Sequence, residues 1–115
     1  MSESGGPKGF VRAGEAETVA EGEMREFDVD GDPRILTRLD GCIYALDGIC
    51  THEYAELIDG EIDEGAIYCP LHGSGFDIRT GRVINLPAVS PLPVYQVELV
   101  DGTVYVSLDP REAEE

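Results

Sequence analysis

Short apolar runs separated by turn residues recur along the chain and predict an all-β fold. Residues 24–29 alternate polar and apolar positions with the period of two that is expected of a strand. Runs at 35–39 and 42–46 flank the dipeptide Asp40-Gly41. This dipeptide favours a tight hairpin, because both central positions of such a turn require positive φ. Many short strands with frequent turns indicate a β-sandwich or barrel.

The remaining expected elements are also short. They comprise a first strand at 10–13, a helical turn or loop at 15–19, a turn at Gly31-Asp32-Pro33, a second turn at Asp47-Gly48, short strands at 61–62 and 66–68, segments at 76–78 and 82–84 around Thr80-Gly81, and a hairpin of 93–100 with 103–108 around Asp101-Gly102. Residues 87–93 hold three of the seven prolines, so a stiff loop is expected there rather than a central strand.

The length of 115 residues predicts a single domain. We expect a flexible leader at 1–9, one domain at 10–108 and an acidic tail at 109–115. No apolar run approaches the roughly 20 residues of a membrane helix, and the N-terminus lacks the regions of a signal peptide. The cysteine content does not suggest a disulfide framework, so a cytoplasmic protein is expected.

The net charge of −16 excludes the basic stripe that nucleic-acid binding requires. Such a charge fits a basic protein partner reached by electrostatic steering. Solubility alone would explain it equally well.

The candidate chemistry lies between residues 50 and 76, which contain both histidines and two of the three cysteines. Cys50 and His52 form a Cys-x-His pair, and Cys69 and His72 form a Cys-x-x-His pair. Two cysteines and two histidines are a known zinc set, but the first pair is cramped for two ligands on one ion. A two-iron, two-sulfur cluster suits the spacing better, because each pair can divide its ligands between two irons.

This pattern resembles the Rieske family, in which Cys-x-His and Cys-x-x-His enclose an intervening stretch, here of sixteen residues. The resemblance implies a Rieske-like antiparallel β-sandwich or barrel with a small cluster-binding subdomain of two loops at about 48–86. It also implies that Cys50 and Cys69 bind the inner iron and that His52 and His72 bind the outer iron of one 2Fe-2S cluster. Imidazoles in place of two thiolates raise the reduction potential to roughly −150 to +300 mV.

Departures from the pattern of respiratory Rieske proteins suggest a potential at the low end of this range. Those proteins carry an extra cysteine in each loop, whereas this chain has Leu71 in the second loop and none at 53–57. Phe76 stands where those proteins have a tyrosine, and phenylalanine has no hydroxyl to donate. The serine hydroxyl of those proteins has a counterpart in Ser74, although Ser74 could equally be an ordinary turn residue. Fewer donors to the cluster stabilise the reduced form less.

Further residues are expected near the cluster. Four residues are candidates for an apolar cover over the cluster: Leu57, Pro70, Leu71 and Pro91. For the two leucines, ordinary packing in the core is the alternative. The remaining cysteine, Cys42, is expected to be a small buried hydrophobe and not a fifth ligand.

The whole chain resembles the stand-alone Rieske ferredoxins of bacterial aromatic-ring-hydroxylating dioxygenase systems. The resemblance implies a monomeric one-electron carrier, not an enzyme, between an NAD(P)H-dependent flavoprotein reductase and a terminal oxygenase. The alternatives are a small Rieske-like subunit of an assimilatory nitrite reductase and a zinc-binding interaction module. An enzyme in its own right lacks support, because no recognisable catalytic constellation remains outside the four ligands.

Overall fold

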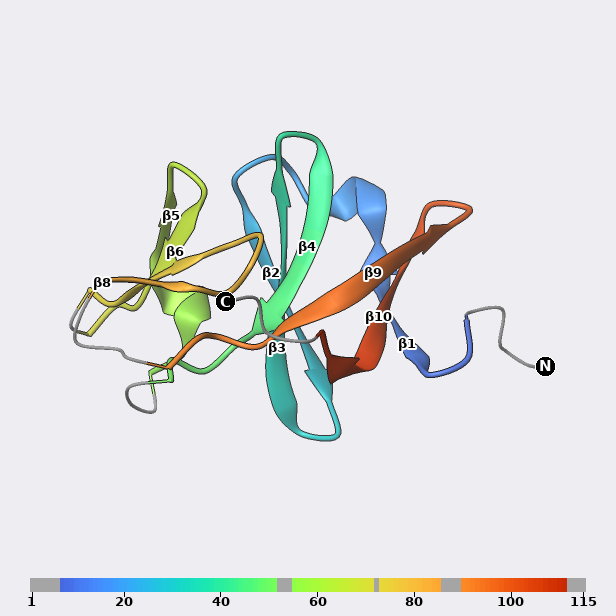
Figure 1. The fold of residues 1–115 in the computed structure, drawn as a ribbon. Coiled ribbons are helices and arrows are strands. Elements are labelled where there is room, and N and C mark those ends of the chain that lie inside the picture. The colour runs from blue at the N-terminus through green and yellow to red at the C-terminus, as the bar shows by residue number, and fades with distance from the viewer. Residues whose placement is uncertain (1–6, 52–54, 72, 86–89, 112–115) are drawn as a thin grey trace.

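Two antiparallel sheets make up the described part of the molecule. The computed structural model describes residues 7–51, 55–71, 73–85 and 90–111. A six-stranded sheet has the order β1-β10-β9-β4-β3-β2, and a four-stranded sheet has the order β5-β6-β7-β8. Figure 1 shows the smaller sheet at the opposite end of the molecule from β1.

The described residues form short strands and two single-turn 3-10 helices. The elements are β1 Phe10–Glu15, η1 Ala16–Thr18, β2 Met24–Val29, β3 Asp32–Leu39, β4 Cys42–Asp47, η2 Leu57–Asp59, β5 Glu61–Asp63, β6 Ala66–Tyr68, β7 Gly75–Asp77, β8 Val83–Asn85, β9 Val94–Val100 and β10 Thr103–Pro110. This architecture confirms the predicted all-β class. β10 runs through Pro110, two residues into the segment expected as the acidic tail.

Aspartate-glycine dipeptides form the tight turns of the larger sheet. Asp40 and Gly41 have φ values of 52° and 81°, and β3 pairs with β4 around them as predicted. The turn expected at residues 31–33 is wrong, because the turn residues are Asp30 and Gly31, with φ values of 53° and 90°. Pro33 instead lies within β3, where its carbonyl oxygen accepts a hydrogen bond of 2.9 Å from the amide of Gly48.

The hydrophobic interior has two parts. One cluster fills the larger sheet with side chains such as Leu36, Val104 and Val106. The other joins the two sheets, since it combines Ile35 and Leu46 of the larger sheet with side chains of the smaller sheet and the loops around it. The second cluster therefore fixes the small sheet against the large one, and it also contains two of the predicted metal ligands.

Polar contacts add to the connection between the sheets. The guanidinium of Arg79, which follows β7, lies 2.6 Å from the carboxylate of Asp40 in the β3–β4 turn. The amide of Leu92 donates to the carbonyl of Gly81 at 2.7 Å, which ties the segment before β9 to the turn before β8. These contacts hold the smaller sheet and its loops in one orientation relative to the larger sheet.

The expectation for Cys42 is wrong, because its side chain is exposed. The residue begins β4 directly after the Asp40-Gly41 turn, opposite Leu39. The turn residues Asp40 and Gly41 before it are exposed and burial begins only at Ile43, so the cysteine at this end of the strand stays in contact with solvent. Among the described residues, no helix is long and apolar enough to cross a membrane.

Candidate metal centre

The first candidate loop follows β4 and is closed at its base by main-chain hydrogen bonds. The amide of Cys50 donates to the carbonyl of Ala55 at 3.0 Å, and the amide of Leu57 donates to the carbonyl of Gly48 at 2.9 Å. The hydroxyl of Thr51 donates to the carbonyl of Ser90 at 2.8 Å. This last bond ties the loop to the proline-rich segment before β9.

The second candidate loop joins β6 to β7 and has the same closure. The amide of Cys69 donates to the carbonyl of Ser74 at 2.8 Å, and the amide of Gly73 donates to the carbonyl of Cys69 at 3.2 Å. In both loops the cysteine amide therefore bonds to the carbonyl five residues later. Each cysteine begins a short loop whose two ends are joined by hydrogen bonds. In the sequence, each predicted histidine falls between the two ends of its loop.

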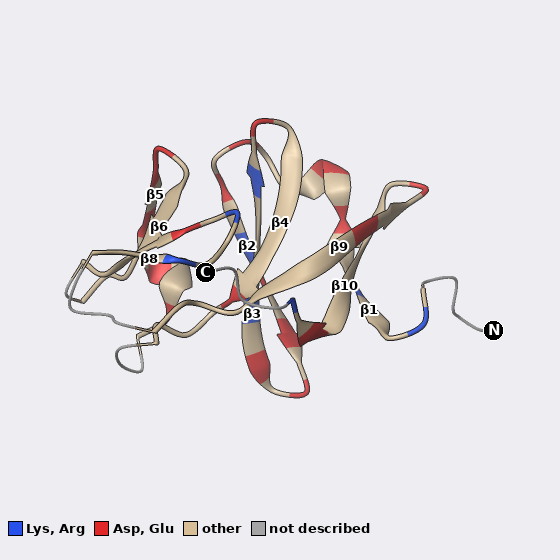
Figure 2. Cartoon of the chain, in the orientation of Figure 1, with Lys and Arg blue, Asp and Glu red and all other residues tan. Residues whose placement is uncertain are grey.

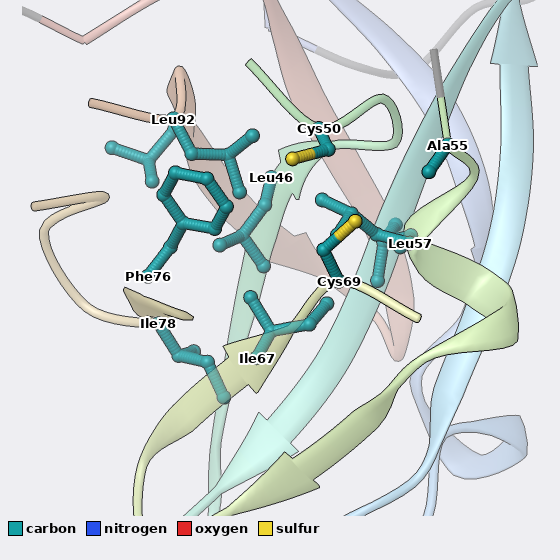
Figure 3. Packing of buried hydrophobic residues seen from close by; sticks show 11 residues of the cluster. Leu46, Cys50, Ala55, Leu57, Ile67, Cys69, Phe76, Ile78 and Leu92 are labelled. Carbon is teal, nitrogen blue, oxygen red and sulfur yellow. The ribbon is translucent and has the colours of Figure 1, made fainter. Parts of the chain in front are cut away.

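The two cysteines lie in one buried cluster. Cys50 is 3% exposed and Cys69 is 4% exposed. Figure 3 shows both side chains at the same end of the cluster, beside Leu46 and Leu57. The three cysteines, all within the described residues, form no disulfide.

The chemistry of this pair fits the iron-sulfur cluster implied by the sequence. Thiolates are the soft ligands that iron-sulfur clusters use, and a buried thiolate needs a compensating positive charge because burial alone disfavours it. Iron bound by this buried pair would supply that charge. His52 and His72 lie outside the described residues, and within the described ranges no group of three or more metal-binding side chains gathers.

The other predicted residues fall into two groups. Leu57 and Phe76 are fully buried in the cluster that contains both cysteines, and Ser74 is 1% exposed. In contrast, Leu71 is 59% exposed, and Pro70 and Pro91 are also exposed. The structure thus places buried apolar side chains next to the two cysteines and leaves Pro70 and Leu71 of the second loop exposed to solvent.

Two bracing residues were missed in the sequence. Thr51 stands inside the Cys-x-His motif, where its link to the proline-rich segment gives no local signal. Asn85 ends β8 and hydrogen-bonds the backbone of the second loop through its side chain. The one available signal was that asparagine is uncommon in strands.

Two acidic side chains border the second cysteine of the candidate centre. An open hollow of about 470 Å³ borders Cys69 and Pro70, with Asp59 and Glu61 on its wall. Figure 2 shows acidic residues on the strands and turns of both sheets, whereas Lys and Arg are few. Three residues before Cys50, burial raises the pKa of Asp47 above its usual value, although nearby Arg34 acts in the opposite direction.

Comparison with known proteins gives concordant matches. Residues 9–96 match the model of the Rieske [2Fe-2S] domain. The chain is 32% identical to the 3-phenylpropionate/cinnamic acid dioxygenase ferredoxin subunit of Photorhabdus laumondii, over 84% of this chain and 91% of that protein. It is 34% identical to the ferredoxin component of the naphthalene 1,2-dioxygenase system of Pseudomonas aeruginosa, over 78% of this chain and 86% of that protein.

Solved structures agree with these matches. The ferredoxin of carbazole 1,9a-dioxygenase from Nocardioides aromaticivorans superposes with a TM-score of 0.80 at 34% identity, covering 89% of this chain and 98% of that chain. A chain from the complex of reduced oxygenase and oxidized ferredoxin in carbazole 1,9a-dioxygenase gives a TM-score of 0.86 at 31% identity, covering 92% of this chain and 99% of that chain.

Proposed function

The chain belongs to the Rieske [2Fe-2S] domain family, and from this premise we propose that it is the ferredoxin component of an aromatic-ring dioxygenase system. The paired loops support this proposal most directly, because two buried cysteines begin loops of matched closure. Relatives of similar length bear the names of ferredoxin components of such systems. The role is transfer of one electron at a time, without catalysis of its own.

The proposed ligands are Cys50 and Cys69 on one iron and His52 and His72 on the other. The cluster supplies one reversible electron when bound. The chain holds the two cysteines through the Cys50–Ala55 and Cys69–Ser74 hydrogen bonds.

The surroundings of the cysteines support a potential at the low end of the Rieske range. Leu57 and Phe76 are fully buried and exclude water from the interior side of the cysteines. Phe76 has no hydroxyl to donate, so the side chain at this position cannot stabilise the more negative reduced state. Hydrogen-bond donors of this kind are what raise the potential of iron-sulfur centres.

The proposed partners are a terminal oxygenase, which accepts the electron, and an NAD(P)H-dependent flavoprotein reductase, which supplies it. In carbazole 1,9a-dioxygenase, a ferredoxin and an oxygenase form a complex. The exposed Leu71 and the acidic hollow beside Cys69 offer an accessible face at the second loop. We place this monomeric carrier in the cytoplasm, where thiols stay reduced.

An EPR-monitored redox titration of the protein purified without added metal tests the proposal. We expect the signal of a histidine-ligated two-iron cluster with a potential in the lower half of the Rieske range. The same signal well above zero would retain the cluster but contradict the dioxygenase-type assignment. A colourless protein that contains zinc would overturn the electron-carrier function.

A further inference from the structure

The last residue of β8 supports the second cysteine loop with its side chain. Asn85 is the register partner of Gly75, at a point where the β7–β8 pairing is irregular between Gly75 and Phe76. Its side-chain oxygen accepts a hydrogen bond of 2.6 Å from the amide of Gly75. Its side-chain nitrogen donates a bond of 3.1 Å to the carbonyl of Gly73.

These two bonds require a carboxamide. One end of the side chain must accept from an N–H group and the other must donate to a carbonyl, which an asparagine of this length does simultaneously. A leucine of similar size would make neither bond. An ionised aspartate would keep the bond to Gly75 but would set a second acceptor against the carbonyl of Gly73.

The braced segment is the one that closes on Cys69. Gly73 donates its amide to the carbonyl of Cys69, and Ser74 accepts the amide of Cys69 through its own carbonyl. Asn85 therefore hydrogen-bonds the backbone of Gly73 and Gly75, the residues on either side of Ser74. The space is tight, because a Cβ atom at Gly75 would stand 2.5 Å from the Tyr68 ring and 2.7 Å from the Asn85 oxygen.

We propose that Asn85 is a positioning residue for the second ligand loop and that it tunes the reduction potential and retention of the cluster. This inference rests on the proposed function and assigns a role to a residue outside the two motifs. The amide acts through the loop backbone, by holding Gly73 and Gly75 in fixed positions relative to Cys69. Supporting groups of this kind influence both the affinity and the electronic properties of a metal centre.

The test compares Asn85→Leu with Gln96→Leu, a matched carboxamide-to-leucine control at an exposed position of β9 in the larger sheet. The readouts are the reduction potential, the EPR line shape and the rate of cluster loss to an iron chelator. For Asn85→Leu we expect a shifted potential, an altered line shape and cluster loss about 10-fold faster than in the wild type. For Gln96→Leu we expect wild-type values.

The possible outcomes separate this inference from the proposed function. A variant that loses thermal stability but keeps the wild-type potential, line shape and release rate would show a merely structural role and overturn the inference alone. Asn85→Ala, which removes both bonds without added bulk, decides the same question if the leucine variant does not fold. A wild-type protein without the two-iron signal would overturn the proposed function, and this inference with it.

Discussion

Gly60 lies directly against the carbonyl of Tyr68, so that a Cβ atom on Gly60 would stand 1.9 Å from that oxygen. Gly60 follows η2, and its amide donates to the carbonyl of Leu57 at 2.9 Å. Tyr68 is the residue before Cys69. A glycine outside both motifs thus permits the segment that ends η2 to pack closely against the residue before Cys69.

Gly60→Ala is expected to destabilise the protein by about 2–3 kcal/mol, because the backbone of Tyr68 must move to make room. Chemical unfolding measures this cost, and visible absorbance measures the expected loss of cluster content. Gly102→Ala is the control, since its φ of 82° strains an alanine but no atom lies within 4 Å of the added Cβ. It is expected to cost about 1 kcal/mol and to keep the cluster. Equal cluster loss in both variants would contradict the steric explanation.

Serine replacements of the three cysteines should divide them by role. Cys50→Ser and Cys69→Ser are expected to abolish the visible and EPR signals of the cluster, because a serine oxygen is a poor substitute for a soft thiolate. Cys42→Ser should retain both signals, since Cys42 is exposed at the start of β4. Loss of the cluster in the Cys42 variant would require a new ligand assignment.

Phe76→Tyr is expected to raise the reduction potential, because its hydroxyl would supply a donor that stabilises the reduced state. The added oxygen enters a fully buried position, so overpacking should also cost about 1–3 kcal/mol. Redox titration followed by EPR provides the measurement. Phe27→Tyr, at a partly buried position packed against the other core cluster, should leave the potential unchanged. An unchanged potential in a cluster-loaded Phe76 variant would refute the role assigned to this position.

Tyr95 should give the protein an alkaline stability limit. Burial is the main cause and the negative charge of Asp47 the second cause that raise the pKa of Tyr95 to about 12. Because the unfolded tyrosine ionises near pH 10, stability from this group is complete below pH 10 and is lost as the pH rises toward 12. The free energy of unfolding should fall by about 2 kcal/mol over this pH range because of Tyr95. Unfolding measured against pH should show this decline in the wild type but not in Tyr95→Phe, and an equal slope in both proteins would rule out Tyr95 as its source.

Electron delivery should weaken as salt increases. The net charge of −16 favours encounter with basic surfaces, and exposed charges are screened over about 8 Å at physiological ionic strength. In an electron-transfer system reconstituted from this protein, a reductase and an oxygenase, the KM of the oxygenase reaction for this protein should rise with added NaCl while kcat changes less. A KM independent of salt would show that the acidic surface serves solubility instead of docking.

The sequence predicted the regular parts of the fold because their signals are local. Strand β2 and the Asp40-Gly41 hairpin depend on alternation and positive φ within a few residues, and both were predicted correctly. The turn at Asp30-Gly31 was misplaced because Pro33 drew the prediction forward, although a proline at this strand position still offers its carbonyl to Gly48.

The supporting contacts of the candidate site could not be predicted, because they join residues distant in sequence. Thr51 reaches Ser90 across 39 positions, and Asn85 reaches Gly73 across 12 positions. Neither partner is specified by the spacing of cysteines and histidines. Exposure of Cys42 was also missed, since a period of two predicts a face but not where the covering layer ends.

The closed bases of the two loops bear on how fast an electron can move. Cys50 and Cys69 are tied by backbone bonds to Ala55 and Ser74, and both are almost inaccessible to solvent. When a cluster bound here changed its charge by one, few mobile dipoles and little water would have to reorient around the half of the site formed by the two cysteines. Preorganised surroundings of this kind cost little reorganisation energy at the moment of transfer. The same closures that hold the cysteines would therefore keep the barrier to electron transfer low once a cluster is bound.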